Sequence, residues 1–197
     1  MSMMTEFADV WQFAVTQHQR VNQQYRHHPY SFHLQQVVNV LETAQHQTGS
    51  EISAVIIQAA ICHDLLEDTG LTYNDLSKVV GVAVADVVYD VTNELGKNRT
   101  DRAERTYPKI AANPAAIVVK LADRIANTEF SRDAGSSMWR KYVAEYPKFR
   151  HWLYQFWQFE SYPEMSVLWD RLDQANPEMS LLWDRSVEST AGRGWLL

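Results

Sequence analysis

The spacing of apolar residues along the chain predicts a succession of amphipathic helices. Apolar positions recur at intervals of three and four over residues 7 to about 22, and again over residues 34–44. Pro29 falls between these two segments and predicts a loop. Residues 52–65 are apolar on nearly every side, which is typical of a buried helix, and Ser50 is its expected N-cap.

The second half of the chain has the same periodicity, with one ambiguous segment. Thr72 and Asp75 have the spacing of a capping box that opens a short helix. Residues 79–91 are rich in valine, which favours strands, but the valines recur at helical intervals and we predict a helix. Asn113 and Pro114 are the N-cap and first residue of a helix to about residue 130. The aromatic-dense residues 137–159 are predicted to be helical as well.

Composition supports an all-α fold. The chain has only 7 glycines and 6 prolines in 197 residues, well below the roughly 12% of an average chain. This scarcity argues against a turn-rich β-sandwich, a collagen-like fibre and a disordered chain. With 46% hydrophobic residues the chain can bury a sizeable core, and its length suits one main domain.

Charge, cysteine content and hydropathy restrict the ligands and the cellular location that we expect. The net charge of −6 argues against bulk nucleic-acid binding but allows a small anionic ligand in a local basic pocket. The single cysteine, Cys62, excludes an internal disulfide and favours the cytoplasm. The longest apolar run, residues 52–62, is too short to span a bilayer, and the first positive charge is Arg20, so we predict neither a membrane span nor a signal peptide.

A short repeat lies near the C-terminus. Residues 163–171 recur as residues 177–185, with eight of nine positions identical and a period of 14. Two copies are too few for a repeat architecture, so we interpret the repeat as a tandem duplication of a terminal helix. We therefore divide the chain into a domain of residues 1–160 and a helical tail of residues 161–197. The Trp-bearing tail could pack on the domain or join two copies of the chain in a homo-oligomer.

Four ionisable residues stand at the end of the apolar segment: His63, Asp64, Glu67 and Asp68. Unpaired charges are costly in a protein interior, so this pattern points to a site. His63 and Asp64 can both turn donor atoms toward one metal ion, and helical spacing places the two later acids one turn further along, near the reacting water. Residue usage alone predicts fewer than ~0.01 occurrences of this pattern in the chain, so the signal is specific.

Further metal ligands must come from distant segments. Asp123 is one candidate, because Lys120 and Asn127 lie on the same stripe of a predicted helix and could bind phosphate and donate hydrogen bonds. The alternative is a solvated face on which Asp123 pairs with Lys120. Spacing does not choose among the histidines that could supply another ligand: His18, His27, His28, His33 and His46.

Residues 97–109 form a basic segment with a net charge of +3 in an otherwise acidic chain. Arginine binds phosphate with two parallel hydrogen bonds, so this segment would attract a polyphosphate ligand. Its candidate contacts are Lys97, Arg99, Arg102 and Arg105. The alternative is a solvated helix surface with an ion pair between Asp101 and Arg105.

Three motifs resemble those of HD-domain metal-dependent phosphohydrolases, and more narrowly the hydrolase domain of RelA/SpoT enzymes and their small stand-alone relatives. Residues 63–69 read HDLLEDT and are similar to the signature HDxxEDT. Residues 29–33 read PYSFH, similar to PYxxH, and residues 120–127 read KLADRIAN, similar to KLADRxxN. The motifs follow the family's order, and the resemblance covers residues 7–154.

This resemblance implies an all-α HD-domain bundle with one divalent metal ion, Mn²⁺, near its centre. Four residues would ligate the ion: His33, His63, Asp64 and Asp123. Glu67 and Asp68 would position or deprotonate the attacking water and assist the leaving group. The implied substrate is guanosine 3′,5′-bis(diphosphate), cleaved to GDP and pyrophosphate. Lys120, Asn127 and the basic segment would hold the nucleotide.

One family feature is missing from this sequence. The family places an Arg-Lys pair in the loop before PYxxH, where the arginine stacks on guanine, but residues 21–28 lack this pair. Tyr25 and Arg26 are the residues that could take its place. Two alternatives follow: a phosphohydrolase of another nucleotide, and a nucleotide-sensing module without turnover. Retention of both Glu67 and Asp68 argues against the second alternative.

Overall fold

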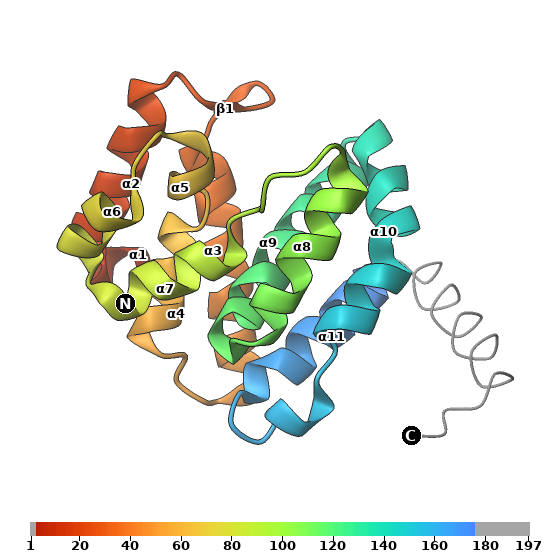
Figure 1. Ribbon diagram of the computed structural model, residues 1–197. Helices are drawn as coiled ribbons and strands as arrows, with labels where there is room; N and C mark the ends of the chain where they lie inside the picture. The colour runs from red at the N-terminus through yellow and green to blue at the C-terminus, as the bar shows by residue number, and fades with distance from the viewer. Residues whose placement is uncertain (1–2, 176–197) are drawn as a thin grey trace, which may run out of the picture.

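The computed structural model of the protein describes residues 3–175, and this part of the chain is almost entirely helical, which confirms the all-α prediction (Figure 1). The helices are α1 (Met3–Glu6), α2 (Ala8–Arg20), α3 (Ser31–Thr48), α4 (Ala54–Cys62), α5 (Leu65–Asp68), α6 (Tyr73–Val80), α7 (Val82–Val91), α8 (Arg99–Ala111), α9 (Pro114–Asp133), α10 (Ser137–Leu153) and α11 (Pro163–Ala175). An antiparallel hairpin joins β1 (Gln24–Tyr25) to β2 (His28–Pro29), and a 3₁₀ turn, η1, spans Phe156–Gln158. None of the described helices is long and apolar enough to cross a membrane.

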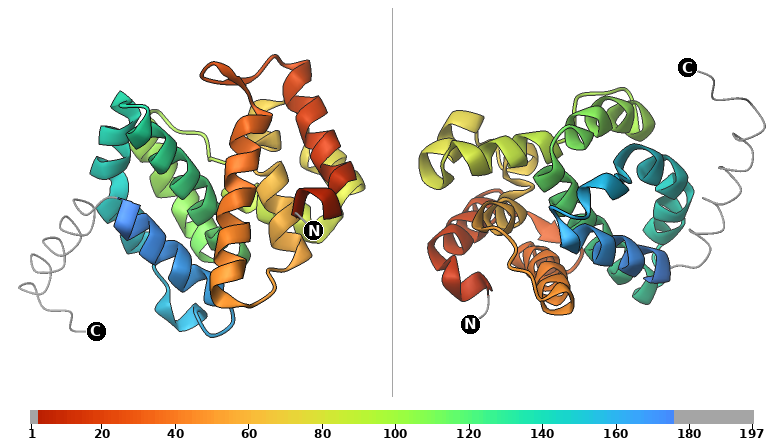
Figure 2. Two further views of the ribbon diagram at one scale, coloured as in Figure 1. Left: turned by 180° about the vertical axis from the view of Figure 1, so that it is seen from behind. Right: turned by 90° about the horizontal axis from the view of Figure 1, so that it is seen from below.

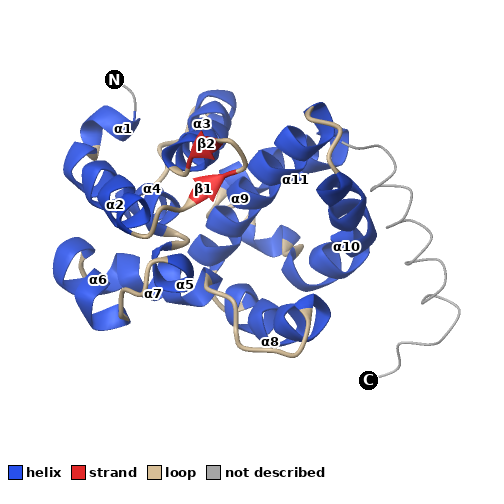
Figure 3. Cartoon of the chain, turned by 90° about the horizontal axis from the view of Figure 1, so that it is seen from above, coloured by secondary structure: helices blue, strands red, loops and turns tan. Residues whose placement is uncertain are grey.

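Helix α9 is the central element of the bundle. It packs against α3, α4, α7, α8, α10 and α11, and Figure 3 shows it running between the helices of the two halves of the chain. Ile117, Leu121 and Ile125, the predicted apolar face, are fully buried. The predicted start is confirmed, since the Asn113 side chain accepts a hydrogen bond from the Ala115 amide at 3.1 Å. The bundle is therefore organised around the helix that carries the KLADRIAN motif.

The valine-rich segment is helical, as its periodicity predicts. Gly81, with a φ of +83°, divides it into α6 and α7. The valines that recur at helical intervals are buried against α4 and α9: Val84, Val87, Val88 and Val91. The capping box is also confirmed, because the Asp75 amide donates to Thr72 Oγ1 at 3.2 Å and the Thr72 amide donates to Asp75 Oδ2 at 3.3 Å.

The apolar segment 52–65 differs from its prediction at both ends. Ser53, not Ser50, is the N-cap, and it accepts a hydrogen bond from the Ile56 amide. The helix begins later because Ile52 lies before it and is buried, with its amide donating to the Gln45 side chain at 2.9 Å. At the other end, α4 stops at Cys62 and α5 starts at Leu65. The prediction of one continuous helix over residues 52–65 was therefore wrong.

Two further helices are shorter than predicted. Helix α2 ends at Arg20, because Asn22 turns into the left-handed region with a φ of +52°. Helix α10 ends at Leu153, and the chain continues through η1 before α11 begins. Both breaks turn the chain back toward the bundle, and the first leads directly into the hairpin before α3.

The first copy of the C-terminal repeat lies in α11, which packs against α9 and α3 (Figure 2). Trp169 is buried, with its ring centroid 5.7 Å from that of Phe149. Arg171 donates two hydrogen bonds to Glu129 of α9, at 2.8 and 2.9 Å. The second copy, residues 177–185, lies outside the described residues, so the proposed domain division stays a prediction.

Glu164, in the first turn of α11, provides a test of this packing. The residue is 4% exposed, and burial raises the pKa of its carboxyl although its own backbone amide acts in the opposite direction. A raised pKa in the folded state means that stability is lost as the pH rises through that pKa. We expect Glu164→Gln to raise Tm at pH 7–8. Near pH 4 the substitution should have little effect, because a glutamate with the unperturbed pKa of about 4.3 is already largely protonated there in the unfolded chain.

The measurement is a thermal melt followed by circular dichroism across this pH range. Glu160→Gln is the matched control, because Glu160 is exposed just before the same helix. Equal melting curves for the Glu164 variant and the wild type at pH 8 would contradict the expectation.

Candidate functional site

The site begins where α4 breaks. His63 Nδ1 lies 2.8 Å from the Ala60 carbonyl oxygen, the group that would accept the Asp64 amide in a continuous helix. This hydrogen bond places the proton of a neutral His63 ring on Nδ1 and turns Nε2 toward the interior. The break also frees Asp64 to turn toward His63, and Asp64 Oδ2 lies 2.9 Å from His63 Nε2.

Two other elements meet His63 and Asp64 at this point. His33, in the first turn of α3, and Asp123, in the middle of α9, lie 3.3 Å apart between Nε2 and Oδ1. Asp123 Oδ1 is also 3.8 Å from His63 Nε2. His33, His63 and Asp64 each offer a ligand atom, and these atoms all lie within 4.8 Å of one another. The structure thus brings together the four residues that the sequence singled out as ligands.

The cluster is buried and its charges are balanced internally. Burial by itself would lower the pKa of His63, but the carboxylates of Asp64 and Asp123 raise it to about 9. Burial likewise opposes ionisation of Asp64, yet the neighbouring His63 holds the pKa of Asp64 well below its usual range. Lys120 has the same effect on the pKa of Asp123, and its Nζ lies 2.9 Å from Asp123 Oδ2. The pairing of Lys120 with Asp123 is therefore present, but on a buried face and not on a solvated one.

The donor set fits a divalent cation. One buried ring nitrogen of the cluster, His63 Nε2, has no hydrogen-bond partner among residues 3–175. His63 Nε2 faces two carboxylates that can accept but not donate, so either a proton or a cation must lie between them. Two imidazoles and two carboxylates suit borderline divalent metals. This cluster is thus a candidate metal centre.

Neighbouring side chains orient the two carboxylates. Tyr30 donates a hydrogen bond to Asp64 Oδ2, and Asn127 Nδ2 donates to Asp123 Oδ1 at 2.5 Å. Tyr25 in turn donates to Asn127 Oδ1 at 2.9 Å, and its ring stacks on His33 with centroids 4.7 Å apart. The hairpin residues before α3 are therefore built into the site.

Glu67 and Asp68 lie beside this cluster and line a cavity together with Asp64 and Asp123. Each acid has a hydrogen-bond donor. The Asn93 backbone and side chain donate to Glu67 at 3.0–3.2 Å, and Gln23 donates to Asp68 Oδ2 at 2.5 Å. Burial and the charge of Asp64 raise the pKa of Asp68, while the bond from Gln23 lowers it.

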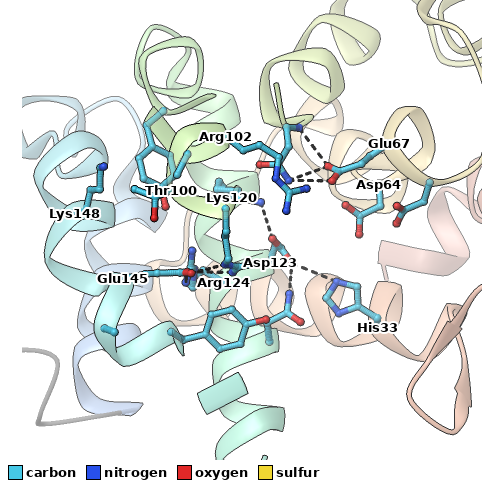
Figure 4. Close-up of a pocket in the computed structure, with 18 of the residues that line it drawn as sticks. His33, Asp64, Glu67, Thr100, Arg102, Lys120, Asp123, Arg124, Glu145 and Lys148 are labelled. Carbon is cyan, nitrogen blue, oxygen red and sulfur yellow. Dashed lines mark hydrogen bonds and ion pairs between the residues drawn. The ribbon is translucent and has the colours of Figure 1, made fainter. Parts of the chain in front are cut away.

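A cavity of about 370 Å³ extends from these acids toward α8 and α10. Figure 4 shows His33, Asp64 and Glu67 at one end of the cavity and Lys148, Glu145 and Arg124 at the other. Arg99 and Arg102 of α8 also line it. Glu145 accepts hydrogen bonds from both Arg99 and Arg124, the latter at 3.0 Å. The cavity thus has a carboxylate- and histidine-rich end and a cationic end.

The other predicted site residues lie elsewhere. Lys97 and Arg105 do not line the cavity, and Arg105 pairs with Asp101 at 3.1 Å, as the solvated-surface alternative predicts. Arg26 is at the exposed tip of the hairpin, with its guanidinium 5.3 Å above the Phe130 ring. Arg99 and Arg102 are therefore the two members of the basic segment that face the cavity.

Four residues in or next to the site were not predicted from the sequence. Tyr30 is part of the PYSFH motif and Arg124 part of KLADRIAN, so proximity to a motif could have drawn attention to both. Asn93 and Gln23 lie in connections with no periodicity, and no sequence signal points to either residue.

The sequence is similar to that of several ppGpp hydrolases, although no protein-family model matches it. It is 31% identical over 119 residues to the guanosine-3′,5′-bis(diphosphate) 3′-pyrophosphohydrolase MESH1 of Danio rerio, covering 58% of this chain and 63% of that protein. It is 39% identical over 79 residues to the pyrophosphohydrolase of Aquifex aeolicus, covering 37% of this chain and 11% of that protein. The chain therefore spans less than two thirds of the length of the animal relative.

A solved structure shares the fold. It is described as a metazoan orthologue of SpoT that hydrolyses ppGpp, and it covers 96% of each chain with a TM-score of 0.55 and 22% identity. This likeness extends over the full bundle, whereas the sequence similarity is confined to a part of it. The resemblance carried by the three motifs is confirmed: the chain has an all-α HD-domain fold and is similar in sequence to RelA/SpoT-type hydrolases.

Proposed function

We propose that the protein is a divalent-metal-dependent phosphohydrolase that removes the 3′-pyrophosphate of guanosine 3′,5′-bis(diphosphate). The observation that carries this proposal is the two-ended cavity, with a candidate metal centre and two acids at one end and arginines at the other. A substrate with two separate diphosphate groups needs both ends. The activity for which the relatives are named, ppGpp pyrophosphohydrolysis, supports the same assignment.

His33, His63, Asp64 and Asp123 would hold the metal. A bound divalent ion supplies a Lewis acid for a phosphate oxygen and lowers the pKa of water. The resemblance to RelA/SpoT hydrolases favours Mn²⁺, and the mixed nitrogen and oxygen donors accord with that choice. The Ala60 carbonyl and Tyr30 would act as outer partners that fix the His63 tautomer and the Asp64 rotamer.

Glu67 and Asp68 would handle the proton. Both line the cavity beside the candidate ligands, and each accepts a hydrogen bond from a side-chain amide. One carboxylate would take the proton of the attacking water, and a proton would be given to the leaving oxygen by the other acid in its protonated form, as general acid–base catalysis requires. The pKa of Asp68 is raised toward neutral pH. This suits a residue that must accept a proton and release it again.

The arginines of α8 that line the cavity would hold the second diphosphate. Arg99 and Arg102 can bind phosphate oxygens with paired N–H donors. Lys120 lies closer to the candidate ligands, and Asp123 and Asp64 raise its pKa despite burial, so it stays charged. It is placed to neutralise charge on the reacting phosphate.

A second candidate is hydrolysis of another phosphorylated nucleotide. The observation that favours it is the position of Arg26 outside the cavity lining, which leaves the base without an arginine from this loop. Tyr25 is the hairpin side chain that lines the cavity. Its ring is an aromatic surface on which any purine could stack.

The test is a substrate panel with Mn²⁺ and purified full-length protein. Pyrophosphate released from the alarmone alone supports the proposal. Phosphate or pyrophosphate released only from other nucleotides supports the second candidate. Metal binding without any hydrolysis across the panel would overturn both and favour a nucleotide-sensing module.

We expect metal binding to release a proton. With a His63 pKa of about 9, the free protein carries a proton on Nε2 at neutral pH, and the cation must displace it. Mn²⁺ affinity should therefore rise by about tenfold per pH unit from pH 7 until the His63 pKa is reached.

Titration calorimetry in buffers of different ionisation enthalpy gives the number of protons released. Asp64→Ala removes a carboxylate ligand and should abolish the binding heat, whereas Asp133→Ala, an exposed acid at the end of α9, should leave it unchanged. Metal affinity that does not depend on pH would contradict this account of His63.

Glu67→Gln separates the proton-handling role from metal binding. The amide keeps the size of the side chain but cannot accept the proton from water, so kcat should fall by about 10²- to 10⁴-fold. Mn²⁺ content, measured by atomic absorption, should be unchanged. The control is Glu51→Gln, an exposed glutamate before α4. Wild-type turnover in the Glu67 variant would refute the assignment.

Arg102 and Arg105 form a matched pair on α8 that tests phosphate binding by this helix. Arg102 lines the cavity and Arg105 points to Asp101 at the surface. Loss of a charge-assisted hydrogen bond to phosphate weakens binding by about tenfold or more. Arg102→Ala should raise KM by that factor, while Arg105→Ala should leave KM within about twofold. Steady-state kinetics with the alarmone give both values, and the same KM in the two variants would exclude this phosphate site.

A further inference from the structure

A chain of hydrogen bonds reaches Asp68 from the side opposite the metal ligands. Gln23 Nε2 donates to Asp68 Oδ2 at 2.5 Å, and Gln23 Oε1 lies 2.6 Å from His18 Nδ1. His18 belongs to α2, Gln23 to the turn that follows it, and Asp68 to α5, which packs against α2. The metal centre and the phosphate contacts explain neither His18 nor Gln23.

The protonation state of His18 determines which group donates and which accepts in each of these hydrogen bonds. His18 is 1% exposed, and burial lowers its pKa, so the ring is neutral near pH 7 and carries one N–H. Gln23 Oε1 can only accept, which places that proton on Nδ1. His18 Nε2 has no hydrogen-bond partner within residues 3–175, so no acceptor stands there to hold the proton on that nitrogen. The Gln23 amide is therefore held with its oxygen toward His18 and its N–H toward Asp68.

The backbone restrains Gln23 as well. Its amide donates to the His18 carbonyl at 3.0 Å, which closes the turn after α2. Asn22, in the left-handed region, makes this tight reversal. Both the main chain and the side chain of Gln23 are thus tied to His18, so the amide presented to Asp68 is preorganised.

His18 also supports the metal side of the site. Its ring centroid lies 4.2 Å from that of Tyr30, and Tyr30 donates to Asp64. One buried histidine therefore stands behind both a candidate proton acceptor and a candidate metal ligand. In a packed interior the position of one group restricts that of the next, so His18 restricts both Asp68, through Gln23, and Asp64, through Tyr30.

We propose that Gln23, held by His18, is a positioning residue that fixes the carboxylate of Asp68 for proton transfer. The titratable groups around Asp68 are Asp64, Glu67, His63 and Tyr30, and the two acids repel the Asp68 carboxylate. The bond from Gln23 occupies Oδ2 and leaves Oδ1 for the reacting water. This inference rests on the proposed function, because it assigns Asp68 a part in that reaction.

The test compares Gln23→Ala with Gln24→Ala. Gln24 is the next residue, the first of β1, and is exposed, so its substitution removes the same kind of side-chain amide without touching Asp68. In Gln23→Ala we expect kcat to fall by about tenfold or more, the effect of a lost hydrogen bond to a charged group. KM, Mn²⁺ content and Tm should stay close to wild type. The acidic limb of the kcat/KM profile should move to higher pH, because the lost bond favoured the ionised carboxylate.

A double variant tests the role of His18. If His18 positions Asp68 through Gln23, His18→Asn combined with Gln23→Ala should move the acidic limb of the kcat/KM profile no further than Gln23→Ala alone, while loss of the contact between His18 and Tyr30 is read separately as Mn²⁺ content. A further shift of the acidic limb in the double variant would refute this role of His18. Equal activity in Gln23→Ala and Gln24→Ala, or a kcat loss with an unmoved pH profile, would overturn the proposal for Gln23 itself.

The Asp68 pKa distinguishes failure of this inference from failure of the proposed function. If the wild-type protein hydrolyses no nucleotide, the proposed function fails, and carboxylate ¹³C NMR still reports the contact between Gln23 and Asp68. A higher Asp68 pKa in Gln23→Ala than in Gln24→Ala would support the positioning contact. The same pKa in both variants would refute it.

Discussion

The burial of Asp123 is the constraint on which the rest of the site depends. An ionised carboxylate is costly in an apolar interior unless other charges and hydrogen bonds compensate for it. Because α9 is surrounded by other helices, Asp123 must be compensated from several directions. Lys120 and Asn127 do so from its own helix, and His33 from α3. The meeting of α3, α4 and α9 is thus both the centre of the core and the centre of the chemistry.

Much of the bundle could be predicted from local sequence. Helical periodicity and N-caps depend on neighbouring residues, so the valine-rich helix and the start of α9 were predicted correctly. The break at His63 could not be predicted in the same way, because it depends on a side chain that takes the carbonyl of Ala60. Its cause is a hydrogen bond, and no helix-breaking residue stands there.

The candidate site was predictable to the extent that motifs carry it. His33, His63, Asp64 and Asp123 come from distant segments, and their common location depends on how three helices pack, which spacing within each segment does not contain. Which face of α8 points to the cavity could not be predicted either. Arg102 faces the cavity and Arg105 faces solvent, although both belong to one basic segment. Residues in connections, such as Asn93 and Gln23, have no pattern and became visible only through their contacts.

Glu145 has a consequence for the molecules that the cavity can admit. Its carboxylate lies between Arg99 and Arg124 much as a ligand phosphate would, and it is attached to the chain. An incoming anion must therefore compete with a tethered one whose effective concentration is high. A weakly charged ligand loses this competition, whereas a diphosphate brings more charge and more acceptor oxygens. The tethered carboxylate thus acts as a threshold that discriminates between ligands by their charge, independently of the base they carry.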